Sequence, residues 1–223
     1  MNHPGLFVVL EGTEGSGKST LAVALGERMR RAGLDPLIVR EPGGTHAAEL
    51  ARQALLDPDR HLGPVAELFF YLAARADLVQ QLIRPALARG RVVLSDRFAM
   101  STEAYQMAGR GLPAEVVLPA NRAAADGLVP DLTLILDLSP EVGQARQVAG
   151  GKQLDRLDRE SREFHRRVAE YYLAAGGEAV RHLDGALPPD RLLQSAWSEI
   201  LKLAPERFGA VADVTASTRD DSE

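Results

Sequence analysis

Residues 12–20 read GTEGSGKST, and they follow an apolar run at residues 6–10, LFVVL. The pattern G-x-x-x-x-G-K-S after a strand-like run is typical of a phosphate-binding loop that leads into a helix. Glycines let the backbone turn so that several N–H groups point at one phosphate, and the following helix directs its positive end at the same anion. In such a loop Lys18 reaches the β- and γ-phosphates, and the Ser19 hydroxyl binds Mg²⁺. The stretch therefore predicts a nucleoside triphosphate site.

The composition of the 223-residue chain fits a single soluble domain, because 45% of its residues are hydrophobic and the formal net charge is −5. This negative charge argues against a general nucleic-acid binder. The chain contains no cysteine, which excludes disulfides, thiolate catalysis and cysteine-based metal sites. We see no apolar run of membrane-spanning length and expect no signal peptide, so we expect a cytoplasmic protein that does not bind membranes.

The order of apolar runs along the chain predicts an α/β fold. Strands are expected at residues 6–10, 37–40, 92–95, 132–138 and 179–183, where the runs lack clean alternation, as in strands buried on both faces. Helices are expected between them, from residue 18 to near Gly33, over 46–56 and 64–88, after Ser101, after Pro113, from Pro140 with Ser139 as its cap, and over 159–175 and 190–203. This alternation predicts a three-layer P-loop NTPase fold with a five-stranded parallel sheet flanked by helices. Ligands of such sheets bind at the carboxyl ends of the strands.

We expect one P-loop kinase domain over residues 1–204. Within it, residues 143–158 contain Gly150-Gly151 and lie between helices, as either a plain surface loop or a mobile lid. The tail over residues 205–223 is polar, and we expect it to be partly disordered because it has little apolar area to bury.

Two polar groups follow predicted strands. Asp96 and Arg97 end the third strand, where the carboxylate can hold Mg²⁺ and the guanidinium can bind a second phosphate. Residues 40–45, REPGGT, end the second strand with a tight turn that can lie near a ligand. The alternatives are a solvated ion pair and an ordinary turn.

A third group lies on predicted helices. Tyr71 and Arg75 are four residues apart, hence on one helix face, where a ring can stack on a base and a guanidinium can bond its carbonyl. On the residues alone, a core tyrosine beside a solvated arginine is the stronger interpretation. Residues 101–106, STEAYQ, offer hydroxyl and amide donors, although Ser101 alone could be a helix cap. The five histidines have no metal-ligand spacing.

Together these segments resemble the thymidylate kinase family over residues 6–172. The resemblance rests on the motifs EGTEGSGKST at 11–20, REPGGT at 40–45, YLAAR at 71–75, DRF at 96–98, ST at 101–102, AYQ at 104–106, GRG at 109–111, PDLTL at 130–134 and LDR at 154–156. It implies a fold of the nucleoside monophosphate kinase type with a short lid. It also implies transfer of the γ-phosphoryl group of ATP to dTMP with Mg²⁺ as cofactor, in a homodimer. The implied partners are ATP and dTMP, with no nucleic acid.

The resemblance also assigns residues. For ATP they are Gly12, Thr13, Glu14, Gly15, Ser16, Gly17, Lys18, Ser19 and Thr20; for the metal, Ser19, Asp96 and Glu14. For dTMP they are Glu41, Pro42, Tyr71, Arg75, Arg97, Ser101, Thr102, Tyr105 and Gln106. Catalysis would fall to Lys18, Glu14, Arg97, Arg156 and Arg146. Arg97 would hold the dTMP phosphate, Tyr71 would stack on thymine, Arg75, Thr102 and Gln106 would contact its edge, and Tyr105 would disfavour a ribose 2′-hydroxyl.

The chain departs from part of the family at Gly15, where one branch has an arginine. The other branch, largely bacterial, supplies a cation from the lid, and we expect this chain to belong to it. Arg156 is the first candidate, followed by Arg146 and Lys152, and Asp158 replaces the usual glutamate of the lid motif. Two other functions stay open: a P-loop kinase with another acceptor, and a regulatory ATPase. The acceptor-type pattern over residues 71–106 disfavours the second.

Overall fold

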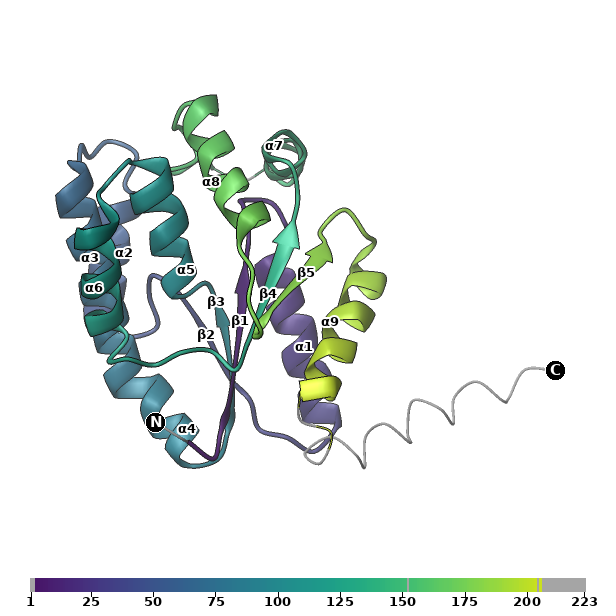
Figure 1. Cartoon of the computed structure of the whole chain (residues 1–223). Coiled ribbons are helices and arrows are strands. Elements are labelled where there is room, and N and C mark those ends of the chain that lie inside the picture. Colours follow the sequence, from purple (N-terminus) through teal and green to yellow (C-terminus); the bar gives the residue numbers. More distant parts are fainter. Residues whose placement is uncertain (1–2, 152, 204, 206–223) are drawn as a thin grey trace.

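The structure, a computed structural model, describes residues 3–151, 153–203 and 205, and contains one parallel five-stranded sheet (Figure 1). Its strands are β1 (Leu6–Glu11), β2 (Leu37–Arg40), β3 (Val92–Asp96), β4 (Leu132–Asp137) and β5 (Val180–Asp184), in the order β2-β3-β1-β4-β5. The predicted strands and their parallel arrangement are confirmed to within one residue at each end.

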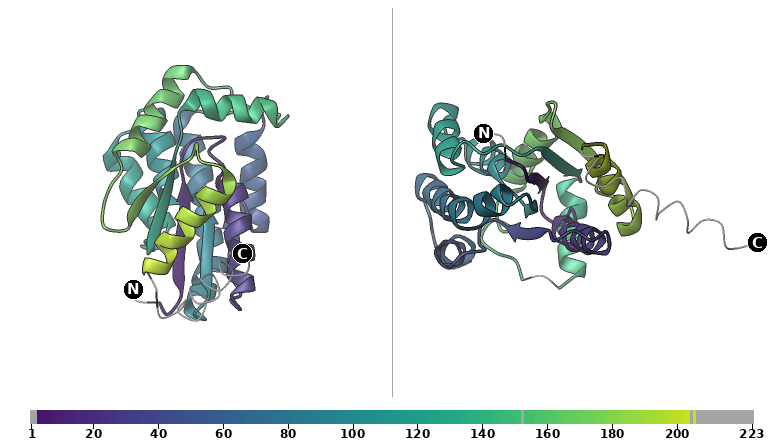
Figure 2. Two further views of the ribbon diagram at one scale, coloured as in Figure 1. Left: turned by 90° about the vertical axis from the view of Figure 1, so that its right-hand side faces the viewer. Right: turned by 90° about the horizontal axis from the view of Figure 1, so that it is seen from below.

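Helices cover both faces of this sheet, which confirms the three-layer fold (Figure 2). The α-helices are α1 (Lys18–Arg31), α2 (His46–Leu56), α3 (Pro64–Leu78), α4 (Arg84–Ala88), α5 (Ala99–Thr102), α6 (Ala114–Ala124), α7 (Pro140–Ala149), α8 (Arg162–Ala174) and α9 (Pro189–Leu203). Two π-helical segments, η1 (Val79–Ile83) and η2 (Glu103–Gly109), continue α3 and α5. Among the described residues, no helix combines the length and hydropathy that crossing a bilayer requires.

The fully buried pattern of β1 results from a core on each side of it. On one side Val8 and Leu10 pack with Leu25 of α1 and Trp197 of α9. On the other, Phe7 and Val9 pack with residues of α3, η1 and α4. Burial of a Val, Leu or Phe side chain contributes about 1.5–3 kcal/mol each, so these two layers hold the strand rigidly and fix the loop that follows it.

The structure corrects two helix boundaries. Residues 143–149, expected as the first half of a loop, continue α7, because Ser139 caps the helix through the Val142 N–H and helix-forming residues run to Gly150. The helix expected after Ser101 begins at Ala99 and places Ser101 inside its first turns.

The predicted tail lies outside the described residues except for position 205.

Candidate active site

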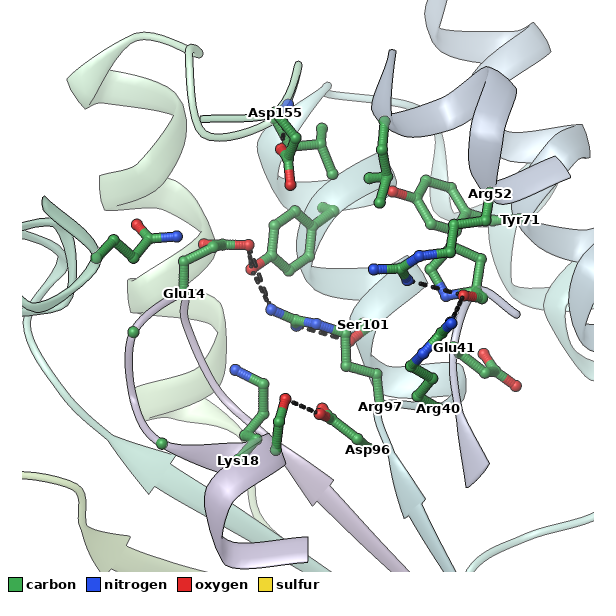
Figure 3. A pocket seen from close by; sticks show the side chains of 18 of the residues that line it. Glu14, Lys18, Arg40, Glu41, Arg52, Tyr71, Asp96, Arg97, Ser101 and Asp155 are labelled. Atoms are coloured by element: carbon green, nitrogen blue, oxygen red, sulfur yellow. Dashed lines mark hydrogen bonds and ion pairs between the residues drawn. The ribbon is translucent and has the colours of Figure 1, made fainter. Parts of the chain in front are cut away.

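A cavity of about 510 Å³ opens at the carboxyl ends of the strands, and this volume falls within the roughly 300–1,000 Å³ typical of ligand pockets (Figure 3). The sheet register pairs Asp96 with both Leu10 and Arg40. The phosphate loop after β1, the end of β3 and the end of β2 therefore meet at one edge of the sheet, as the strand-end rule predicts.

The phosphate loop has the conformation that its glycines were predicted to allow. Gly12, Gly15 and Gly17 have φ angles of 132°, 72° and 95°, in the region that disfavours other residues. At Gly15 an added Cβ would lie 2.2 Å from the carbonyl oxygen of Gly143 in α7. An arginine at position 15 does not fit this packing, which gives a physical reason for the departure from the arginine-bearing branch.

Lys18 lies buried at the start of α1 and points into the loop. Its Nζ donates to the Thr13 carbonyl at 2.6 Å and to the Ser16 hydroxyl at 3.2 Å. Burial, with the nearby charge of Arg97, lowers the pKa of the Lys18 ammonium to about 8. A phosphate beside Nζ supplies the opposite charge that favours the ammonium form, so this lysine is suited to an anionic ligand.

Ser19 and Asp96 form a pair of oxygen groups on the floor of the cavity. The Ser19 hydroxyl donates to the Asp96 carboxylate at 2.5 Å. Hydroxyl and carboxylate oxygens are the ligands that Mg²⁺ prefers, and this cation usually completes its shell with water and phosphate oxygens. Among the described residues, no cluster of three acidic, histidine or cysteine side chains forms a metal cage. The pair therefore fits a cation that arrives with a nucleotide.

Glu14 and Arg97 face each other across the cavity. Arg97 Nη2 donates to Glu14 Oε1 at 3.2 Å, and the Tyr105 hydroxyl donates to the same oxygen (Figure 3). Burial opposes ionisation of Glu14, but the charges of Arg97 and Lys18 outweigh it, so the pKa of the carboxyl lies below its usual value. The carboxylate predicted as a metal ligand is thus bonded to Arg97 and Tyr105.

Arg75 lies behind the cavity, with its side chain only 1% exposed. Its Nε and Nη2 donate to Glu41 at 2.8 and 2.5 Å, its Nη1 donates to Thr102 and Asn121, and Nη2 also donates to the carbonyl of Phe98. These bonds occupy all of the guanidinium's N–H groups. The structure therefore contradicts a solvated helix charge, and the contact of Arg75 with the base stays a prediction.

Other predicted side chains form the wall that faces the cavity. Tyr71, Thr102, Tyr105 and Gln106 line it, and the Gln106 amide donates to the buried Glu67 at 2.9 Å. The π-helical turn η2 brings Tyr105 and Gln106 to this wall, in keeping with the frequent use of such turns at functional sites. An aromatic ring beside hydroxyl and amide groups provides a surface that fits a planar base.

Most of the predicted site residues therefore share one cavity. Those that line it are Glu14, Gly15, Gly17, Lys18, Ser19, Thr20, Glu41, Pro42, Tyr71, Asp96, Arg97, Ser101, Thr102, Tyr105, Gln106 and Arg146. Gly12, Thr13, Ser16, Arg75 and Arg156 are absent from that lining.

Two arginines that the sequence analysis did not assign also line the cavity. Arg40 and Arg52 donate to the carbonyl of Pro42 at 3.3 and 2.8 Å, from the end of β2 and from α2 (Figure 3). The strand-end rule could have identified Arg40, because it pairs with Asp96 in the sheet. No sequence signal identifies Arg52, whose position depends on how α2 packs.

The lid candidates differ in their placement. Arg146 lines the cavity and donates to the carbonyl of Gly185 at 2.8 Å. Arg156 instead donates to the carbonyl of Leu55 at 2.9 Å and lies 2.6 Å from a carboxylate oxygen of the buried Glu67. Lys152 is outside the described residues. The structure thus brings Arg146, and not Arg156, to the cavity.

The chain is similar to known proteins over most of its length. Residues 10–195 match the sequence profile of a family described as thymidylate kinase. A thymidylate kinase of Ectopseudomonas mendocina is 50% identical over 207 residues, which cover 92% of this chain and 98% of that protein. A thymidylate kinase of Pseudomonas fluorescens is 51% identical over 195 residues, covering 86% and 92% of the two chains, and one of Deinococcus radiodurans is 43% identical over 199 residues, covering 88% and 96%.

Proposed function

The chain belongs to the thymidylate kinase family, and on that premise we propose that its cavity transfers the γ-phosphoryl group of ATP to dTMP, giving dTDP and ADP. This proposal rests on one observation: residues of the phosphate loop line the same cavity as Arg97, Tyr71 and Gln106. Phosphoryl transfer requires two anionic groups in line with their charge neutralised, so catalysis is mostly positioning and electrostatic stabilisation.

ATP binds at the phosphate loop in this proposal. Backbone N–H groups of residues 12–20 surround its phosphates, and the Lys18 ammonium exchanges the Thr13 carbonyl for β- and γ-phosphate oxygens. The Ser19–Asp96 pair would hold Mg²⁺, which when bound neutralises charge on the phosphates. Glu14, beside Tyr105, orients the guanidinium of Arg97.

dTMP occupies the other half of the cavity. Arg97 binds its phosphate, and Tyr71 stacks on the thymine ring while Thr102 and Gln106 contact the base edge. The Tyr105 ring, whose hydroxyl is fixed by Glu14 and Arg97, crowds the position of a ribose 2′-hydroxyl. Glu41, Pro42 and Ser101 also line this half of the cavity, and Arg75 supports it from behind.

An acceptor panel tests this function. We expect ADP to form rapidly only when dTMP is supplied with ATP and Mg²⁺, and more slowly with dUMP, CMP, GMP or thymidine. Chelation of Mg²⁺ should abolish the reaction. Protein with Lys18→Ala, purified in the same way, controls for contaminating kinases. Rapid turnover with another monophosphate and none with dTMP would contradict the proposal, and ATP hydrolysis independent of any acceptor would favour a regulatory ATPase.

We further propose that residues 143–158 act as the lid and that Arg146 supplies its cation, ahead of Arg156. Arg146 already lines the cavity, whereas Arg156 would first have to leave the buried Glu67. Loss of one charged hydrogen bond costs about 1.5–3 kcal/mol, so Arg146→Ala should lower turnover about ten- to a hundredfold at saturating ATP and dTMP. Arg156→Ala should have a smaller effect. The exposed Arg159, directly after this segment, gives a matched control. If the variants at 146 and 156 both keep full turnover, neither arginine is the catalytic cation.

The homodimer and the cytoplasmic location remain proposals. Apolar side chains are exposed on the adjoining helices α2, α3 and α6, with Leu50 at 54%, Phe69 at 59% and Leu118 at 44% exposure. A second copy that covers this face removes them from water, and the mass of the protein in solution tests this, since Phe69→Glu should shift a dimer to monomer. We place the protein in the cytoplasm because it uses ATP, which cell fractionation can check.

A further inference from the structure

Glu11 is fully buried at the end of β1, directly before the phosphate loop, and is absent from the cavity lining. We propose that Glu11 is a positioning residue for Arg97. It fixes both the backbone of Arg97 and, through two hydroxyl groups, the guanidinium that binds the acceptor phosphate. This inference rests on the proposed role of Arg97.

The first contact is with the backbone around Arg97. Arg97 has a φ of 74°, a left-handed conformation that costs free energy in any residue with a side chain and persists only where its surroundings enforce it. Its own N–H donates to the carbonyl of Leu10 at 2.9 Å, and the next N–H, of Phe98, donates to Glu11 Oε1 at 2.9 Å. The end of β1 therefore holds the peptide groups on both sides of the strained residue.

The same carboxylate oxygen also starts the helix that follows. Glu11 Oε1 accepts the N–H of Ser101 at 3.1 Å, in addition to that of Phe98. It thereby provides for α5 the acceptor that a capping side chain usually provides. This explains why α5 begins before Ser101.

The second contact is with the side chain of Arg97. The hydroxyls of Ser101 and Tyr172 donate to Glu11 Oε2 at 2.6 and 2.8 Å, and Arg97 Nη1 donates to these two hydroxyls at 3.1 and 3.3 Å. A hydroxyl has a single proton, so one that donates to the carboxylate presents only its lone pairs to Arg97. Glu11 thus sets the direction of both hydroxyls. Together with the Gly12 carbonyl, which accepts from Nη1 at 3.1 Å, they hold Nη1 while Nη2 faces Glu14 and Tyr105.

The charges are consistent with this arrangement. Burial raises the pKa of the Glu11 carboxyl, and the charge of Arg97 together with the hydrogen bonds from Ser101, Phe98 and Tyr172 opposes that rise. Burial is the larger effect, so the pKa of Glu11 lies above its usual value and that of Glu14 below it, and the two acidic groups that flank Arg97 have different contacts. Glu14 bonds the guanidinium directly, and Glu11 acts through hydroxyls and backbone.

Two substitutions test the hydroxyl bridge. Glu11→Gln keeps the shape and the Oε1 acceptor, but its amide group donates where Oε2 accepted, so the two hydroxyls must turn. Tyr172→Phe removes one hydroxyl and keeps the ring in its core cluster. We expect each variant to raise the KM for dTMP about tenfold, the size of one charge-assisted hydrogen bond, and to leave the KM for ATP within about twofold. Because both substitutions break the same hydroxyl bridge, the KM for dTMP of the double variant should be little higher than that of Glu11→Gln alone.

Two controls separate the outcomes. Tyr171→Phe removes a neighbouring hydroxyl on α8 that donates to Glu103, and it should leave both KM values unchanged. Arg97→Ala should raise the KM for dTMP by more than either test variant, and if it does not, the role of Arg97 itself is wrong. If Arg97→Ala has its effect but Tyr172→Phe does not, Glu11 does not position the guanidinium through the Tyr172 hydroxyl, and the proposed bridge is wrong. An equal rise of the KM values for ATP and dTMP would likewise overturn the inference, and so would additive effects of the two substitutions on the KM for dTMP in the double variant. Should Glu11→Gln not fold, Tyr172→Phe still decides it.

Discussion

Lys18→Ala should lower the turnover of this enzyme at least about a hundredfold, the effect of removing one preorganised electrostatic donor. Charge on the transferred phosphoryl group and its bridging oxygen changes during the reaction, and an ammonium at that point stabilises the transition state more than the ground state. Water cannot replace it, because a neutral molecule does not supply the positive charge of the ammonium.

The same variant should fold normally. Within the described part of the chain, the Lys18 ammonium donates hydrogen bonds only to its own loop, at Thr13 and Ser16, and burial already disfavours its charged form. Its charge also lowers the pKa of Glu14, but that carboxylate keeps its direct ion pair with Arg97 when Lys18 is removed. We expect the thermal unfolding midpoint of ligand-free Lys18→Ala to equal that of the parent protein, with most of the stabilisation by ATP lost. Lys202→Ala, on an exposed side chain, is the matched control for loss of a lysine. Near-normal turnover in a folded Lys18→Ala protein would contradict the role of this lysine.

Local patterns in the sequence predicted the parts of the molecule that depend on local physics. A strand buried on both faces is expected to be continuously apolar, so β1 was found from the five apolar residues 6–10, and the structure extends it to Glu11. The phosphate loop was found because only glycine adopts its positive φ angles without strain. The carboxyl ends of parallel strands lie at one edge of a sheet. The position of Asp96 and Arg97 at the end of a predicted strand was therefore enough to expect them near that loop.

Side chains whose roles depend on distant partners could not be predicted in this way. In the sequence Glu11 stands between the apolar run at 6–10 and the phosphate loop, and its partner Tyr172 lies 161 residues later in the chain. Arg75 reads as a charged residue on a helix, and the carboxylate that neutralises it is 34 residues earlier. Contacts between residues so far apart in the sequence produce no pattern in the spacing of hydrophobic residues. The close packing of Gly15 against Gly143 is a third case, because it requires α7 to be in place.

Arg75→Ala should destabilise the fold by about 3–5 kcal/mol, the usual cost of removing one partner from a buried ion pair. The side chains of Arg75 and Glu41 are 1% and 4% exposed. Burial raises the pKa of the Glu41 carboxyl, the charge of Arg75 opposes this, and Glu41 Oε1 has no hydrogen-bond partner among the described residues. Without the guanidinium, Glu41 is left as a buried acid with no counter-charge, and Asn121 also loses a donor.

Thermal or denaturant unfolding measures this effect, and for a chain of this size the unfolding midpoint should fall by roughly 6–20 °C. Arg31→Ala is the matched control, because that arginine is 82% exposed and its loss should change stability by less than about 0.5 kcal/mol. Glu41→Gln in the Arg75→Ala background should recover part of the loss, because it removes the stranded carboxylate. At a temperature where the variant is folded, the KM for dTMP should rise and that for ATP should not, since Thr102 loses its donor and the phosphate loop does not touch Arg75. If Arg75→Ala lowers the free energy of unfolding by less than about 1 kcal/mol, the buried ion pair is not essential for stability. Water or another cation would then reach Glu41, and Arg75 would be free to bond the base directly.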